Sequence, residues 1–261
     1  MHLSPKRGMI AGNIREERTD PMNRILAMVL KNLTFVPGAW FRLCRYARHP
    51  ERYPEETMYR HIQTILRRGI RSGNIRVVSS GQENIPAQGG VMLYGNHQGL
   101  FDVLAIAVTC DRPLGVVLKK ELANIPFIRQ VCRCTKSFAM DREDVRQSLT
   151  VIRAVTEEVQ KGRGYVIFPE GTRSRQGNTM LEFHGGSFRC AVKSRCPIVP
   201  IAFIDSFRVL DEKGCRPVSM EIHYLKPIPY EEYKGLSTTE LAALVKGRIQ
   251  EKLDEHGGRE S

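Results

Sequence analysis

The chain has 261 residues, of which 41% are hydrophobic and 26% charged. It is therefore long enough for one domain with a packed core and too apolar for a disordered protein. The apolar run at residues 25–30 is far shorter than the roughly 20 residues that span a bilayer. Residues 1–18 are polar and basic, unlike a secretory signal, and seven irregularly spaced cysteines indicate reduced thiols in the cytoplasm.

The net charge of +12 is concentrated in the first third of the chain. Residues 1–80 contain 15 Lys+Arg and 6 Asp+Glu, and 13 of these cations are arginine. Such an excess of positive charge indicates a polyanionic partner, either nucleic acid or an anionic membrane surface. Charge alone does not distinguish between these two partners.

Three helices are predicted within this basic part. Asp20-Pro21 resembles a helix start, and an apolar stripe over residues 25–33 predicts the first helix. Pro37-Gly38 is expected to break it, and a second helix covers residues 39–48. A third helix, over residues 55–71, has apolar side chains at helical spacing with arginines among them.

The side chains of these helices indicate a membrane partner. Trp40, Phe41 and Leu43 alternate with Arg42 and Arg45. Basic amphipathic helices with such residues are typical of interfacial membrane anchors. We therefore predict that residues 1–73 form a membrane-docking segment. The alternative is that the apolar stripes pack on the core while the arginines are solvated.

From residue 75 onward, short β-type runs alternate with helices, which is the pattern of an α/β fold. We predict that residues 74–261 form a mixed central sheet flanked by helices. The clearest helix covers residues 142–161, capped by Asp141, and the last begins with a capping box at Ser237 and Glu240. The strand candidates are residues 75–79, 91–94, 115–118, 137–140, 165–168, 198–203 and 220–224.

A candidate acid–base pair follows the second predicted strand, in the string Gly95-Asn-His-Gln-Gly-Leu-Phe-Asp102. On a continuous helix, His97 and Asp102 would lie about 140° apart. They meet if His97 lies in the turn after the strand and Asp102 in the first turn of the next helix. The carboxylate would then fix the tautomer of the imidazole and stabilise its protonated form. Read alone, the string is also ordinary turn chemistry.

A second polar turn, Phe168-Pro-Glu-Gly-Thr-Arg-Ser174, ends another predicted strand. Its side chains are expected at the carboxyl edge of the sheet, where α/β folds bind ligands. Arg173 offers a planar fork of donors that suits phosphate oxygens, although a solvated arginine in an exposed turn is the alternative. Lys119 and Lys120 follow a further strand and add cations at the same edge.

Together these motifs resemble those of the glycerolipid acyltransferases, typified by 1-acylglycerol-3-phosphate acyltransferase, over residues 75–206. Asn96-His97-x4-Asp102 resembles the catalytic motif of the family, and Lys119-Lys120-Glu121-Leu122 its second block. Phe168–Ser174 resembles the glycerophosphate-binding motif, and Ile198-Val-Pro-Ile-Ala202 the last, apolar block. The chain departs from the family at Arg129, where glycine is frequent, and at His184, where lysine is frequent.

The resemblance implies that an acyl chain passes from an acyl thioester to the sn-2 hydroxyl of 1-acylglycerol-3-phosphate, giving phosphatidic acid. His97 would be the general base, oriented by Asp102, and attack would be direct because no serine elbow is present. Arg173 would hold the acceptor phosphate, while Glu170 orients that arginine or contacts the glycerol backbone. The expected substrate-binding residues are Asn96, Lys119, Lys120, Glu170, Gly171, Thr172 and Arg173.

No metal or cofactor is expected, and the acyl donor would be acyl-coenzyme A or acyl-carrier protein. The protein would bind an anionic membrane and no nucleic acid, as a peripheral or monotopic protein on the cytoplasmic face of the cell membrane. Glycerol-3-phosphate or another lysolipid is the alternative acceptor. A non-catalytic binder of anionic surfaces would need neither polar turn, and a thioesterase would not need the phosphate-binding arginine.

Overall fold

The computed structural model describes residues 22–211 and 214–260, and a seven-stranded sheet lies at its centre. The strand order is β1-β7-β6-β2-β5-β3-β4, and all neighbours are parallel except β6 and β7. The sheet is therefore mixed, as predicted, and all seven predicted strands are present with ends shifted by two residues at most. The strands are β1 (Ile75–Ser80), β2 (Val91–Gly95), β3 (Leu114–Lys119), β4 (Phe138–Met140), β5 (Gly164–Ile167), β6 (Ile198–Ile204) and β7 (Val218–Tyr224).

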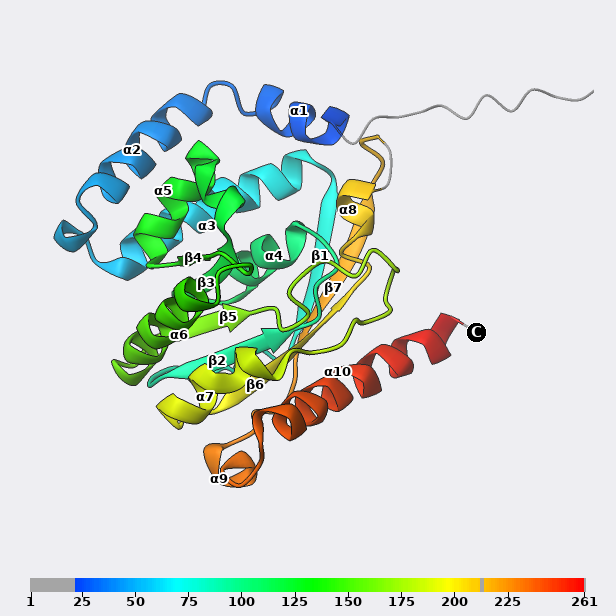
Figure 1. The fold of residues 1–261 in the computed structure, drawn as a ribbon. Helices are drawn as coiled ribbons and strands as arrows, with labels where there is room; N and C mark the ends of the chain where they lie inside the picture. Colours follow the sequence, from blue (N-terminus) through cyan, green and yellow to red (C-terminus); the bar gives the residue numbers. More distant parts are fainter. Residues whose placement is uncertain (1–21, 212–213, 261) are drawn as a thin grey trace, which may run out of the picture.

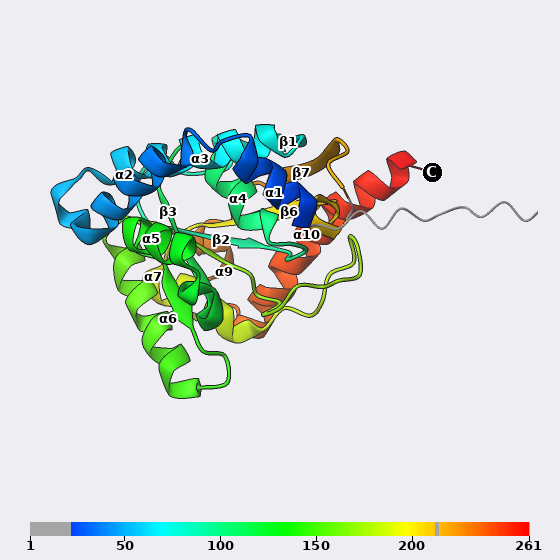
Figure 2. The ribbon, with the colours of Figure 1, turned by 90° about the horizontal axis from the view of Figure 1, so that it is seen from above.

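Helices cover both faces of this sheet (Figures 1 and 2). Helices α6, α7 and α10 pack on one face, and α3, α4 and α8 on the other, while α2 and α5 pack beside α3. The helices are α1 (Met22–Leu30), α2 (Val36–Arg48), α3 (Glu55–Ser72), α4 (Phe101–Thr109), α5 (Pro126–Thr135), α6 (Val145–Gln160), α7 (Arg189–Ser194), α8 (Arg208–Asp211), α9 (Tyr230–Tyr233) and α10 (Thr238–Glu260).

Strand β2 shows why the central strands are apolar throughout. Met92 and Tyr94 lie in the cluster under α6, α7 and α10, whereas Val91 and Leu93 lie in the cluster under α4. Successive side chains of a strand point to opposite faces, so a strand covered on both sides buries every residue. This burial fixes the register of β2 and therefore the position of the polar turn that follows it.

The first three helices form a layer outside the sheet. Helix α3 agrees with the prediction, and Asp20-Pro21 lies outside the described residues. The predicted break at Pro37-Gly38 is wrong, because α2 already begins at Val36. Proline fits the first turn of a helix, where its missing N–H would have no intrahelical acceptor.

Two predicted caps have different outcomes. The capping box of α10 is confirmed, since the Glu240 carboxylate accepts from the Ser237 N–H and the Ser237 hydroxyl from the Glu240 N–H. The predicted cap of α6 is wrong: the Asp144 carboxylate, rather than that of Asp141, accepts from two N–H groups of the first turn. Asp141 instead forms an ion pair with Lys120.

Helix α2 is apolar on two sides, and only one of them packs. Leu43 is 0% exposed and lies in a cluster with Met58 and Ile62 of α3, whereas Phe41 is 71% exposed. We predict that Leu43→Ala lowers the free energy of unfolding by about 2–5 kcal/mol, because it leaves a cavity among three helices. Phe41→Ala is the matched control on the same helix, with an expected change within about 0.5 kcal/mol. Equal midpoints in urea for the two variants would show that α2 does not pack as described.

Candidate active site

His97 and Asp102 meet as the sequence predicts. His97 lies in the turn after β2, and Asp102 lies in the first turn of α4. His97 Nδ1 is 2.7 Å from Asp102 Oδ2. An ionised carboxylate only accepts, so Nδ1 carries the proton in this contact and Nε2 keeps its lone pair. The ring also stacks on Phe168, with centroids 4.3 Å apart, which fixes the plane of the imidazole.

The Asp102 carboxylate is fully buried and receives hydrogen bonds on both oxygens. Besides His97, its Oδ2 accepts from the N–H of Gln98 at 2.8 Å and of Gly99 at 3.0 Å. Its Oδ1 accepts from the Ser206 hydroxyl. A buried charge is tolerated when its oxygens are satisfied in this way. These hydrogen bonds therefore hold the carboxylate in one orientation beside His97.

The second polar turn holds the backbone of His97 from the other side. The Glu170 carboxylate accepts from the His97 N–H at 2.7 Å, and the Ser174 N–H donates to the His97 carbonyl at 2.9 Å. The strands preceding these turns, β2 and β5, are parallel neighbours, so their carboxyl ends lie at one edge of the sheet. The two motifs found in the sequence thus form one site.

Glu170 has a different role from the one expected. Its second oxygen accepts from the Leu181 N–H at 3.0 Å, so both oxygens bind backbone rather than Arg173. Burial raises the pKa of Glu170, against the opposing effect of the two N–H donors. The side chain joins the His97 turn to the loop at residues 171–184.

Asn96 is also turned away from the site. Its amide donates to the Phe203 carbonyl at 2.9 Å and accepts from the Phe203 N–H at 2.8 Å. Asn96 is 1% exposed, and both polar atoms of its side chain are used to join the end of β2 to β6. The side chain therefore has a structural role, and its contact with substrate stays a prediction.

Arg173 has no polar partner among the described residues. It is half-buried, makes no hydrogen bond or ion pair with any residue that the structure describes, and precedes Ser174, which binds the His97 carbonyl. Next to it, Thr172 is exposed and Gly171 is half-buried. Gly171 has a φ of +73°, a conformation that favours glycine, so it is needed for the turn itself.

The two lysines lie at the same edge but further along it. Lys119 ends β3 and Lys120 follows it directly. Because β5 separates β3 from β2, the two lysines lie about 10 Å to the side of β2. Both are exposed, and their cations pair with Glu121 and Asp141 respectively. Within residues 22–211 and 214–260, no hydrogen bond or ion pair joins these two side chains to the His97 turn.

Several residues at the site escaped the sequence analysis, namely Gln98, Phe168 as a stacking partner, Asn178 and Ser206. Gln98 lies between the two residues of the His-x4-Asp motif. This position is the one feature of the sequence that could have marked it as a site residue. Ser206 and Asn178 carry no local signal, because their partners lie at least 27 residues away along the chain. These contacts arise from the order of the strands.

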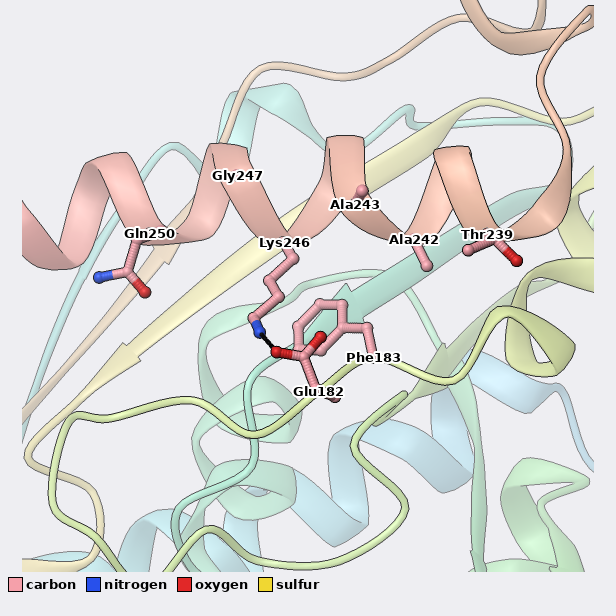
Figure 3. A pocket seen from close by; sticks show the side chains of 8 residues that line it. All are labelled: Glu182, Phe183, Thr239, Ala242, Ala243, Lys246, Gly247 and Gln250. Atoms are coloured by element: carbon pink, nitrogen blue, oxygen red, sulfur yellow. Dashed lines mark hydrogen bonds and ion pairs between the residues drawn. The ribbon is translucent and has the colours of Figure 1, made fainter.

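The loop that begins at Glu170 continues to α10. Glu182 and Phe183 line a groove of about 370 Å³ with Ala242, Ala243 and Gly247, and Lys246 forms an ion pair with Glu182 across it (Figure 3). The residues lining this groove do not include the His97–Asp102 pair. The ion pair anchors the loop whose Leu181 N–H binds Glu170.

Known proteins similar to this chain are acyltransferases. The acyltransferase family model matches residues 76–204. The chain is 30% identical to the 1-acyl-sn-glycerol-3-phosphate acyltransferase of Salmonella typhimurium over 168 residues. This match covers 64% of this chain and 68% of that protein. The protein of the same name from Borreliella burgdorferi is 28% identical over 182 residues, 69% of this chain and 72% of its own.

The fold is also found among solved structures. The crystal structure of the 1-acyl-sn-glycerophosphate acyltransferase from Thermotoga maritima superposes with a TM-score of 0.72 over 91% of this chain and 96% of that one. At 19% identity, this likeness shows the shared fold. The sequence matches show that this chain is an enzyme of the acyltransferase family and belongs with its 1-acyl-sn-glycerol-3-phosphate acyltransferases.

Proposed function

We propose that this enzyme transfers an acyl chain from a thioester donor, either acyl-coenzyme A or acyl-carrier protein, to the sn-2 hydroxyl of 1-acylglycerol-3-phosphate. The product is phosphatidic acid. The observation that carries the proposal is the attachment of the Arg173 turn to the backbone of His97. This attachment supports a mechanism in which Arg173 binds the acceptor phosphate while His97 acts as the general base. Incubation of the protein with acyl thioesters and a panel of glycerol phosphates and lysolipids, with products identified by mass, tests both substrates.

The proposed mechanism depends on the orientation of the His97 imidazole. His97 Nε2 takes the proton of the acceptor hydroxyl while the oxygen attacks the thioester carbonyl carbon. The resulting tetrahedral intermediate collapses, the carbon–sulfur bond breaks, and the thiolate receives the proton from His97. Asp102 stabilises the imidazolium between these steps without taking its proton. Arg173 holds the acceptor phosphate and so brings the hydroxyl to His97.

The first test is the pair itself. We expect His97→Ala to lower kcat by about 10²–10⁴ in a protein with unchanged thermal unfolding, since a positioned general base is lost. Asp102→Asn should also be severe, because the correct tautomer is no longer enforced. The half-buried His49 provides the control, and His49→Ala should keep full activity. Near-normal turnover of His97→Ala would remove the general base from the mechanism.

The second test concerns the phosphate. Arg173→Ala should raise KM for the phosphorylated acceptor by about 10- to 100-fold, as expected for losing hydrogen bonds to a charged group. Arg173→Lys should recover part of this loss, because lysine lacks the two-pronged contact. Arg195, an exposed arginine after α7, is the control. An unchanged acceptor KM together with a weakened donor KM would assign Arg173 to the donor instead.

We further propose that the enzyme reaches its lipid acceptor by docking α1 and α2 on the cytoplasmic face of an anionic membrane. Large apolar side chains of this region are exposed, among them Leu30, Leu33 and Phe41, and Arg42 and Arg45 beside them are exposed too. Within residues 22–211 and 214–260, no helix is long and apolar enough to cross a bilayer. Each buried large side chain contributes about 1.5–3 kcal/mol at most, and each arginine near an anionic leaflet about 1 kcal/mol.

A triple variant, Leu30→Ser with Leu33→Ser and Phe41→Ser, tests this docking. We expect its partitioning onto anionic vesicles to fall by at least about tenfold in co-sedimentation, because three interfacial side chains are lost. Binding of the unaltered protein should weaken at high salt, where screening shortens the reach of the arginines. The control is Val145→Ser with Leu149→Ser, two exposed apolar residues of α6. If the triple variant and the control bind vesicles equally well, the exposed apolar residues of α1 and α2 do not dock the enzyme.

A further inference from the structure

The turn after β6 brings a hydroxyl against the Asp102 carboxylate. Asp205 has a φ of +59°, which is rare outside glycine and reverses the chain as β6 ends. The next residue, Ser206, is 1% exposed, and its hydroxyl donates to Asp102 Oδ1. The three other donors to this carboxylate all bind Oδ2. Ser206 therefore holds the oxygen that His97 does not contact.

Ser206 is itself held in place by Gln98, and Asn178 binds both Gln98 and Asp205, the residue before Ser206. Gln98 Oε1 accepts from the Ser206 N–H at 3.0 Å, and Gln98 Nε2 donates to Asn178 Oδ1 at 2.8 Å. Asn178 also binds Asp205 twice, accepting from its N–H at 2.9 Å and donating to its carboxylate at 3.0 Å. These contacts join the His97 turn, the loop after β5 and the turn after β6. The position of the Ser206 hydroxyl is thus determined from several directions.

The geometry explains why a second contact on Asp102 matters. The terminal torsion of an aspartate is broad, so a carboxylate bound at one oxygen can rotate about its last bond. Rotation would move Oδ2 and, with it, the imidazole that Oδ2 orients. A donor on Oδ1 opposes this rotation. Misplacement of a reacting group by a small distance is enough to slow a transfer reaction strongly.

We propose that Ser206 is a positioning residue for acyl transfer. Its hydroxyl holds the Asp102 carboxylate, and through it the His97 ring, in the orientation in which Nε2 faces the acceptor hydroxyl. The inference rests on the proposed function, because it takes His97 as the general base. It adds a residue that lies beyond the His-x4-Asp motif, at the end of a different strand.

The test is Ser206→Ala, compared with Ser206→Thr and Ser206→Cys. We expect Ser206→Ala to lower kcat by about 10- to 100-fold, while KM for donor and acceptor changes by less than about twofold. Ser206→Thr or Ser206→Cys should recover activity, because each retains a side-chain donor that can bind Asp102 Oδ1. Ser194→Ala is the matched control: it removes a hydroxyl that donates to the Cys190 carbonyl at 2.7 Å in α7. It should leave kcat unchanged.

Repeating Ser206→Ala in the Asp102→Asn protein shows whether the hydroxyl acts through Asp102. In that background the further loss of kcat should be less than about twofold, because interacting residues are not additive. An equal loss in both backgrounds, or an unchanged kcat in Ser206→Ala while His97→Ala is inactive, overturns the proposal. Full activity of His97→Ala would instead remove the general base of the proposed mechanism, on which this inference rests, so the two failures are distinct.

Discussion

The buried carboxylate of Asp102 organises the edge of the sheet at which the candidate active site lies. Asp102 has to be satisfied on both oxygens, because an unpaired charge in a protein interior is strongly destabilising. The turn at residues 97–99 supplies three of its donors and Ser206 the fourth. The carboxyl ends of strands β2 and β6 must therefore lie next to each other. Gly99 allows this approach, since a Cβ there would lie 3.1 Å from the Ser206 carbonyl oxygen.

A second buried carboxylate completes the arrangement. Glu170 binds the backbone of His97, while Asp102 binds its ring, so the histidine is held at both ends. Acidic groups thus act here as acceptors for N–H donors rather than as partners for cations. Arg173 makes no hydrogen bond or ion pair with either carboxylate, or with any other residue in the ranges 22–211 and 214–260. The two carboxylates therefore maintain the shape of the site and do not neutralise this arginine.

The outer helices also divide their residues between two roles. Helix α2 packs Leu43 against α3 and leaves Phe41 in solvent, so one helix is both part of the core and part of the surface. Periodicity in the sequence reveals the apolar positions of such a helix. It does not tell which of them face protein and which face solvent, because the side chains are chemically alike.

The sequence by itself determined the seven strands, the main helices and the association of His97 with Asp102, because these depend on local patterns of burial and on residues five apart. It did not determine that Asn96 joins two strands, that Glu170 binds backbone, or that Ser206 completes the carboxylate. Those contacts link residues 107, 73 and 104 positions apart. The order of strands in the sheet decides them, since it alone sets which strand ends become neighbours.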